Sequence, residues 1–113
     1  MTLVWTAWNN GRHAASGAGY GLKVPIHDRN LYFDREWASV LLELSLNGKY
    51  TKTEVSISKP SFWNETCHEL ISKDIGNWLR QLKLAPWHRG APPNILIQHL
   101  GSKRFRAIGQ EPT

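Results

Sequence analysis

Apolar and polar residues alternate along much of the chain, which is the pattern of strands that are buried on one face. The alternation predicts seven strands, over residues 3–8, 20–24, 39–46, 49–58, 67–71, 94–100 and 104–108. Asn47-Gly48 joins the third strand to the fourth and is a strong signal for a two-residue hairpin turn. Many short strands favour a barrel-like sheet, because closure hides strand edges that would otherwise stay unpaired.

Two segments predict short helices. Pro25 suits the first turn of a helix over 26–33. The apolar side of that helix would comprise Ile26, Leu31, Tyr32 and Phe33. Ser72 is typical of an N-cap and begins the second helix, which Gly76 weakens from inside. Apolar residues recur there at helical spacing: Ile75, Trp78, Leu79 and Leu82.

Residues 59–65 read Lys-Pro-Ser-Phe-Trp-Asn-Glu and directly follow the fourth predicted strand. Two large aromatic side chains beside Asn and Glu are costly to leave on a loop unless they pack or bind something. In one interpretation Phe62 and Trp63 fold back over the core and Asn64 closes a turn. In the other, Phe62 faces the core while Trp63 and Asn64 contact a ligand. The segment alone supports both equally.

The chain has 113 residues, the size of one ordinary domain, with a core expected over about 3–108 and a loose tail over 109–113. Six tryptophans form an unusually dense set, which suits a core of large plates, a binding surface or both. The formal net charge of +5 favours polyanionic partners such as nucleic acid.

Cys67 is the only cysteine, so no internal disulfide can form and a reducing compartment is expected. The first residues do not read as a signal peptide, and no apolar run reaches the length of a membrane span. These features predict a cytoplasmic protein without membrane contact.

Motifs for catalysis and cofactors are weak. Gly17-Ala18-Gly19-Tyr20-Gly21 is like a phosphate-binding loop, but a strand rather than a helix follows it, so we expect no nucleotide site there. The five histidines lack the spacing of a metal-binding helix, and we expect no metal and no cofactor. Cys67 and His68 would suggest an enzyme only if a carboxylate joined them in a pocket.

Several pieces of the chain resemble the B3 DNA-binding domain, found in plant transcription factors and in the recognition domains of some bacterial restriction enzymes. Leu22-Lys23-Val24-Pro25 followed by 26–33 resembles its second strand and first helix, and Ser61-Phe62-Trp63-Asn64 resembles the segment after its fourth strand. Residues 75–84 resemble its second helix and the turn that follows. The resemblance implies a mainly β, α+β fold: a seven-stranded open pseudobarrel with two short helices, here as a small standalone version of bacterial type.

In that family two arms grip the major groove of double-stranded DNA. The resemblance places them here at residues 9–18, which we call the first arm, and at 59–65, which we call the second arm. The leading hypothesis is therefore a non-catalytic DNA-binding module. Its base-edge contacts would come from Asn10, His13, Trp63 and Asn64. Its remaining contacts, mainly to phosphates, would come from Arg12, Lys59, Ser61, Lys103, Arg104 and Arg106.

The alternative hypothesis is a protein-interaction or structural domain of the same fold that does not bind DNA. Its partner would dock on the aromatic second arm and on the proline-rich loop that holds Trp87 and Pro92. The positions of lysine and arginine separate the two hypotheses. One basic face around both arms would favour DNA, and an even scatter would favour a protein partner.

Overall fold

The computed structural model describes residues 2–112 and shows one mainly β fold. Its strands are β1 (Thr2–Asn9), β2 (Tyr20–Lys23), β3 (Ser39–Leu46), β4 (Lys49–Ser56), β5 (Glu69–Ile71), β6 (Asn94–Gly101) and β7 (Arg104–Gln110). Its helices are α1 (Ile26–Tyr32), α2 (Pro60–Trp63) and α3 (Lys73–Gln81). The seven predicted strands are confirmed, whereas the second arm holds a third, very short helix that the alternation did not predict.

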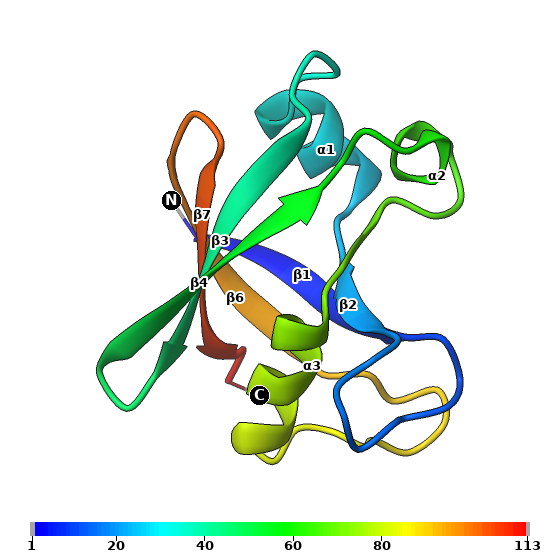
Figure 1. Ribbon diagram of the computed structural model, residues 1–113, viewed down its shortest axis with the longest axis vertical. Coiled ribbons are helices and arrows are strands. Elements are labelled where there is room, and N and C mark those ends of the chain that lie inside the picture. The colour runs from blue at the N-terminus through cyan, green and yellow to red at the C-terminus, as the bar shows by residue number, and fades with distance from the viewer. Residues whose placement is uncertain (1, 113) are drawn as a thin grey trace.

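The seven strands form one sheet in the order β4-β3-β7-β6-β1-β2-β5. Every neighbouring pair is antiparallel except β3 and β7, which run parallel. The two end strands, β4 and β5, approach each other, so the sheet curls into a nearly closed barrel (Figure 1). The barrel-like architecture expected from the many short strands is therefore observed.

The β3–β4 hairpin forms as predicted. Asn47 and Gly48 both have positive φ, 52° and 79°, as a type I′ turn requires. Thr53, Val55 and Ile57 are buried, while the residues between them are exposed. The alternation of the sequence therefore sets the inward face of β4.

The core fills the barrel and includes an aromatic cluster at the end that carries α1 and α2. The members of this cluster are Trp5, Phe33, Phe62 and Phe105. Phe33 is its centre, with its ring centroid 4.8 Å from that of Phe105, 5.2 Å from that of Phe62 and 5.9 Å from that of Trp5. These side chains come from β1, α2, β7 and the residue after α1, so one cluster joins both ends of the chain.

Two expectations from the sequence are wrong, one about the C-terminal tail and one about the buried face of α1. Gly109 and Gln110 belong to β7, and the backbone N–H of Glu111 donates to the carbonyl of Asn94 at 2.8 Å, so residues 109–111 of the expected tail are ordered by pairing, while Thr113 lies outside the described residues. On α1, Ile26 and Leu31 are 39% and 61% exposed rather than apolar-side residues of the core. The buried residue of that helix is Arg29.

Glu43 of β3 is only 3% exposed and is held by two arginines of β7. Arg106 donates from Nε and Nη2 to Oε1 at 3.0 and 2.9 Å, and Arg104 donates from Nη2 to Oε2 at 3.3 Å. The hydrogen bonds from Arg106, aided by those from Arg104, lower the pKa of the Glu43 carboxyl against the opposing effect of burial. A charged network therefore covers the parallel β3–β7 junction.

We expect Glu43→Gln to lower the thermal unfolding midpoint by about 4 °C at pH 7, because losing charge-assisted bonds to partly exposed arginines costs about 1 kcal/mol. Since folding lowers the pKa of Glu43, its carboxylate stabilises the fold above the ordinary pKa of 4.5. That contribution is lost as the pH falls below this value. Melting curves at neutral pH and at about pH 2 should show the gap to wild type closing in acid.

Glu54→Gln is the matched control, because Glu54 is exposed on β4 and has no ion pair within residues 2–112. Its midpoint should stay within about 2 °C of wild type at either pH. A Glu43→Gln variant that lies as far below wild type in acid as at neutral pH would contradict the ion-pair account.

Candidate functional site

The two arms lie at opposite ends of β2 and on the same side of the barrel (Figure 1). The first arm leads into Tyr20 at the start of β2. At the other end, Lys23 pairs with Glu69 of β5, and its Nζ donates to the carbonyl of Thr66 at 2.9 Å, just beyond the second arm. β2 itself is short, since its four residues span about 13 Å of extended chain.

An arginine of α3 holds the first arm. The Arg80 guanidinium donates from Nη2 to the carbonyl of His13 at 2.7 Å and from Nε to the carbonyl of Ala14 at 3.1 Å. Inside the arm, the Asn9 side-chain oxygen accepts the backbone N–H groups of Gly11 and His13 at 2.7 and 3.2 Å. The loop is therefore tied to the barrel by hydrogen bonds to its backbone.

Two glycines allow the first arm to lie directly against α3. Gly17 has a φ of +87°, and its backbone passes so close to Gly76 that a Cβ on Gly76 would collide with the Gly17 carbonyl. A glycine inside a helix normally costs stability. Here Gly76 is required, because only a residue without a side chain leaves room for the Gly17 backbone. From the helical pattern alone, Gly76 was expected only to destabilise the helix.

A second arginine, from α1, holds the second arm. Arg29 donates from Nη1 to the carbonyl of Phe62 at 3.1 Å and also to the carbonyl of Asn64. Burial, together with repulsion from Arg35, lowers the pKa of the Arg29 guanidinium. Arg29 thus satisfies carbonyls at the end of α2, a helix too short to pair them internally. Sequence patterns did not reveal this role, because the partners lie more than thirty residues away.

The second arm combines the two interpretations of its sequence. Phe62 is fully buried, and the Trp63 indole N–H donates to the carbonyl of Ile57 at 2.8 Å. The Asn64 side-chain oxygen closes the turn by accepting two backbone N–H groups, those of Thr66 and Cys67, at 2.9 and 2.7 Å. The Asn64 amide nitrogen has no partner within residues 2–112 and remains free to donate.

The other residues expected to contact DNA from the arms are exposed or half-buried. Asn10 and Arg12 are exposed, and the Asn10 side-chain oxygen accepts the Arg12 backbone N–H at 3.1 Å. His13 is half-buried, since its Nδ1 lies 2.8 Å from the Tyr20 hydroxyl. Lys59 and Ser61 are also half-buried, at the start of α2.

The remaining predicted cations lie elsewhere. Lys103 is in the β6–β7 turn, and Arg104 and Arg106 follow it on β7, on the side of the barrel away from both arms (Figure 1). Both arginines are paired with Glu43. The structure therefore does not bring these three residues together with the other seven.

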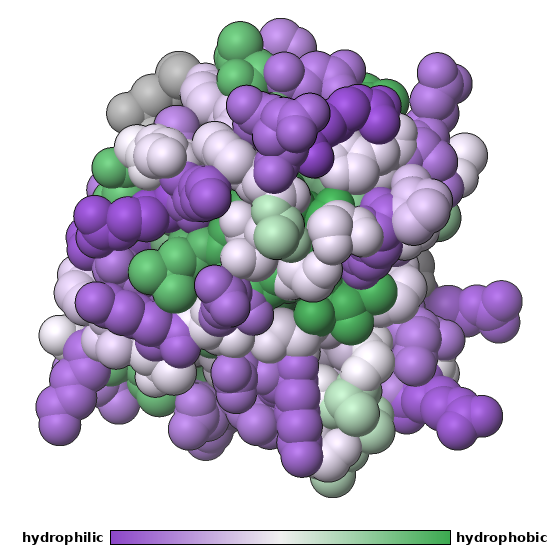
Figure 2. Space-filling model, turned by 45° about the horizontal axis from the view of Figure 1, so that its top comes forward, coloured by the Kyte–Doolittle hydropathy of each residue, from purple (hydrophilic) through white to green (hydrophobic). Residues whose placement is uncertain are grey.

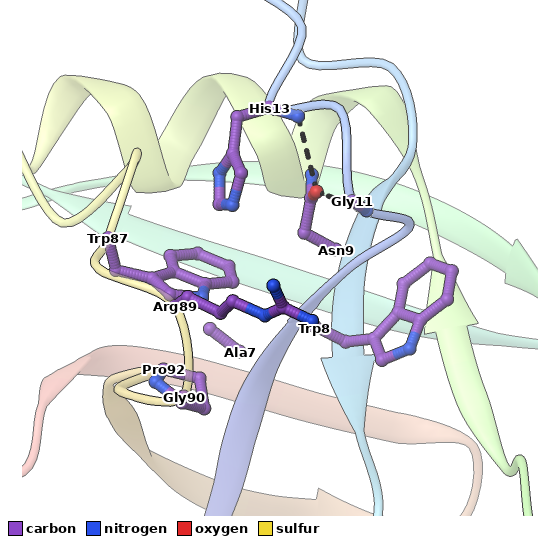
Figure 3. Close-up of a pocket in the computed structure, with 9 residues that line it drawn as sticks. All are labelled: Ala7, Trp8, Asn9, Gly11, His13, Trp87, Arg89, Gly90 and Pro92. Atoms are coloured by element: carbon purple, nitrogen blue, oxygen red, sulfur yellow. Dashed lines mark hydrogen bonds between the residues drawn. The ribbon is translucent and has the colours of Figure 1, made fainter.

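Each arm borders an open hollow that the sequence did not predict. The Trp8 hollow, of about 670 Å³, lies between the first arm and the loop before β6 (Figure 3) and is lined by Ala7, Trp8, Asn9, Gly11, His13, Trp87, Arg89, Gly90 and Pro92. The Trp63 hollow, of about 470 Å³, is lined by Arg35, Ser58, Lys59, Pro60, Trp63 and Asn64. Strand alternation could have identified Trp8, because it places this side chain on the outward face of β1.

The possible enzyme residues are not gathered in a pocket. Among the residues described, neither Cys67 nor His68 lines any of the hollows found, and His68 is buried with Nδ1 against the carbonyl of Val24. Within residues 2–112, no three His, Cys, Asp or Glu side chains are placed to hold a metal ion. No helix in the same range is long and apolar enough to cross a membrane.

Comparison with protein-family models, curated proteins and solved structures gave no match. The resemblance to the B3 domain therefore stays a prediction from the sequence. What the structure establishes is the barrel-like sheet of seven strands.

We expect Gly76→Ala to destabilise the protein by about 1–3 kcal/mol, because the new Cβ forces the first arm away from α3. Helix propensity alone predicts the opposite sign, a gain of up to about 1 kcal/mol. Urea denaturation followed by circular dichroism gives the free energy of unfolding and decides the sign. Gln81→Ala, at an exposed position of the same helix, is the control and should change stability by less than about 0.5 kcal/mol. A stabilised Gly76→Ala variant would show that the glycine contact does not hold the arm.

Proposed function

We propose that the chain binds double-stranded DNA without catalysing a reaction, with the two arms on the major groove. The observation that carries the proposal is that two tethered arms, one at each end of β2, each border a hollow with an indole and a cation. At the first arm these are Trp8 and Arg89, and at the second Trp63 and Arg35. Neither arginine has an acidic partner within residues 2–112.

A duplex presents phosphates along both rims of its major groove, which is about 12 Å wide. Cations at the rims of the groove would neutralise phosphates, and this releases counterions and supplies most of the affinity. Arg12 and Lys59 are the arm residues placed for this task, with Arg35 and Arg89 beside them.

The contacts that Trp63 and Asn64 make within the protein limit the base-edge contacts that were expected of them from the sequence. The Arg35 guanidinium lies 4.9 Å from the ring centroid of Trp63, so this indole supports a cation rather than offering a free ring face. The Asn64 oxygen is used in the turn, which excludes a bidentate bond to adenine. Its amide nitrogen can still donate one bond to an acceptor on a base edge.

The distribution of charge favours the protein-partner alternative by the criterion drawn from the sequence, because the basic residues are scattered over the barrel. Lys49 and Lys52 lie on the β3–β4 hairpin and Lys103 on the β6–β7 turn, so the basic residues do not form one face. In the view of Figure 2, polar side chains cover most of the surface and apolar ones form only small separate patches. A permanent protein interface is commonly more apolar than this face, whereas a transient one is not. DNA is favoured here because each arm borders a hollow that holds an indole and an arginine without an acidic partner within residues 2–112.

The loop proposed for a protein partner is already partly occupied. The Trp87 ring packs against the rings of His13 and Tyr20, with centroids 4.8 and 5.6 Å away. Much of its surface is thus used to position the first arm. A pull-down that keeps a partner after nuclease treatment would favour the protein-interaction alternative.

Duplexes of random sequence should bind with a steep dependence on salt. We expect the double variant Arg12→Ala, Lys59→Ala to weaken binding across all sequences and to reduce the slope of log affinity against log salt by about 1–2, since each phosphate contact contributes about 0.9. Fluorescence anisotropy titrations over a range of salt concentrations measure both quantities.

Lys103→Ala is the matched control, because it removes one exposed cation on the side of the barrel away from the arms. Its affinity and slope should equal those of wild type. If wild type shows no binding at low salt, DNA binding is ruled out; if Lys103→Ala weakens binding as much as the arm variant does, the arms are not the binding surface.

A further inference from the structure

We infer that the Trp8 hollow takes a single unpaired nucleotide of a bound DNA strand, with its base against the indoles and its phosphate at Arg89. The inference rests on the proposed DNA binding and goes beyond groove contact, because it assigns this hollow to one base outside the double helix. Figure 3 shows the Arg89 side chain extending from its loop toward Trp8. In this view it overlaps the Trp87 ring, and His13 lies above that ring.

The lining of the hollow selects an electron-rich ligand. None of its nine lining residues is acidic, while Arg89 supplies a cation. The indole N–H groups of Trp8 and Trp87 have no acceptor within residues 2–112, unlike those of Trp5, Trp63 and Trp78. An aromatic site for a ligand cation would instead lack an arginine, since like charges repel. Donors, a positive charge and aromatic walls together match a base with its phosphate.

Not every polar side chain that lines the Trp8 hollow is free to bind a ligand. Asn9 uses its oxygen for Gly11 and His13, and its nitrogen donates to the carbonyl of Gly19 at 3.3 Å. The wall therefore has few groups left to read a base edge. Recognition must come from stacking and from the phosphate, so the hollow should accept different bases with modest preference.

The aromatic walls explain why the nucleotide must be unpaired. A paired base exposes only its edges in the groove, because its ring faces are covered by neighbouring base pairs. Indoles gain stacking energy from a ring face, which becomes accessible only when the base leaves the stack. The volume of about 670 Å³ lies in the range of small-ligand sites, about 300–1,000 Å³.

The contrast with the second arm supports this assignment. At Trp63 the guanidinium of Arg35 already faces the ring, and the indole N–H is bonded to Ile57. Trp8 lacks both contacts among the residues described, and it pairs across the sheet with Gly21, which has no side chain to cover it. Of the two hollows beside the arms, the one at the first arm therefore offers the more open indole surface.

The test compares a fully paired duplex with the same duplex carrying one extra, unpaired adenosine. We expect the unpaired base to bind about tenfold tighter, equivalent to about 1.4 kcal/mol, because the cost of opening a base pair is absent. Trp8→Ala and Arg89→Gln should each remove most of this advantage, measured as the ratio of the two affinities. Arg89→Gln should also weaken both duplexes alike, because Arg89 is one of the cations proposed to face phosphates. Val4→Ala, on the same outward face of β1, is the control and should keep the full advantage.

A second readout follows the indole N–H signals of the ¹⁵N-labelled protein, with the Trp8 signal assigned from Trp8→Phe. The unpaired-base duplex should shift the Trp8 and Trp87 signals, and the paired duplex should not. Adenosine monophosphate alone tests whether the hollow binds a free nucleotide instead of a nucleotide within a DNA strand. If it shifts these signals while the unpaired base in DNA does not, the assignment to a DNA strand is overturned.

The two proposals fail in different ways. Absence of binding to either duplex would overturn the DNA-binding function itself. Equal affinity for both duplexes, with the Trp8 signal unmoved, would overturn only the single-nucleotide site. Loss of the advantage in Val4→Ala as well would trace it to the stability of β1, and this also overturns the site.

Discussion

The burial of Phe33 at the centre of the aromatic cluster is the interaction on which the arrangement of this molecule most depends. Its ring lies between those of Trp5, Phe62 and Phe105, which come from β1, α2 and β7. Fully burying a side chain of this size stabilises a fold by about 1.5–3 kcal/mol, and a contact between aromatic rings adds about 0.5–1.5 kcal/mol. Since Phe62 belongs to the second arm, the same cluster that closes the barrel also positions that arm.

Each arm is fixed to the barrel by an arginine that contacts its backbone. Arg80 bonds to carbonyls of the first arm and Arg29 to carbonyls of the second. These two arginines are therefore structural, and they are removed from the set of cations available to a polyanion. Tethered arms lose less conformational entropy on binding than flexible loops do, so this design favours recognition of a ligand with a regular shape.

Local sequence patterns predicted most of the fold. The alternation around Asn47-Gly48 set the β3–β4 hairpin, and the Ser72 hydroxyl accepts the Asp74 backbone N–H at 3.1 Å, as expected of an N-cap. In these places the structure depends on residues close together in sequence. The burial of Arg29 on α1 escaped prediction, because its reason is a pair of carbonyls in a distant segment.

The candidate site was predicted only in part, for the same reason. The resemblance assigned the arms to residues 9–18 and 59–65, and this assignment stays a prediction. Arg104 and Arg106 were grouped with the arms by charge alone, although the fold pairs these arginines with Glu43. The Trp8 hollow needs β1 and the loop around Arg89 to meet, some eighty positions apart in the chain. No pattern within one segment contains that information.

The central claim is that the two arms act together as one binding surface. The most direct measurement is the change in backbone amide signals of the ¹⁵N-labelled protein when a fully paired duplex is added. The account predicts changes concentrated in residues 9–18 and 59–65. Changes centred on Lys103 and β7, or no changes at low salt, would contradict it.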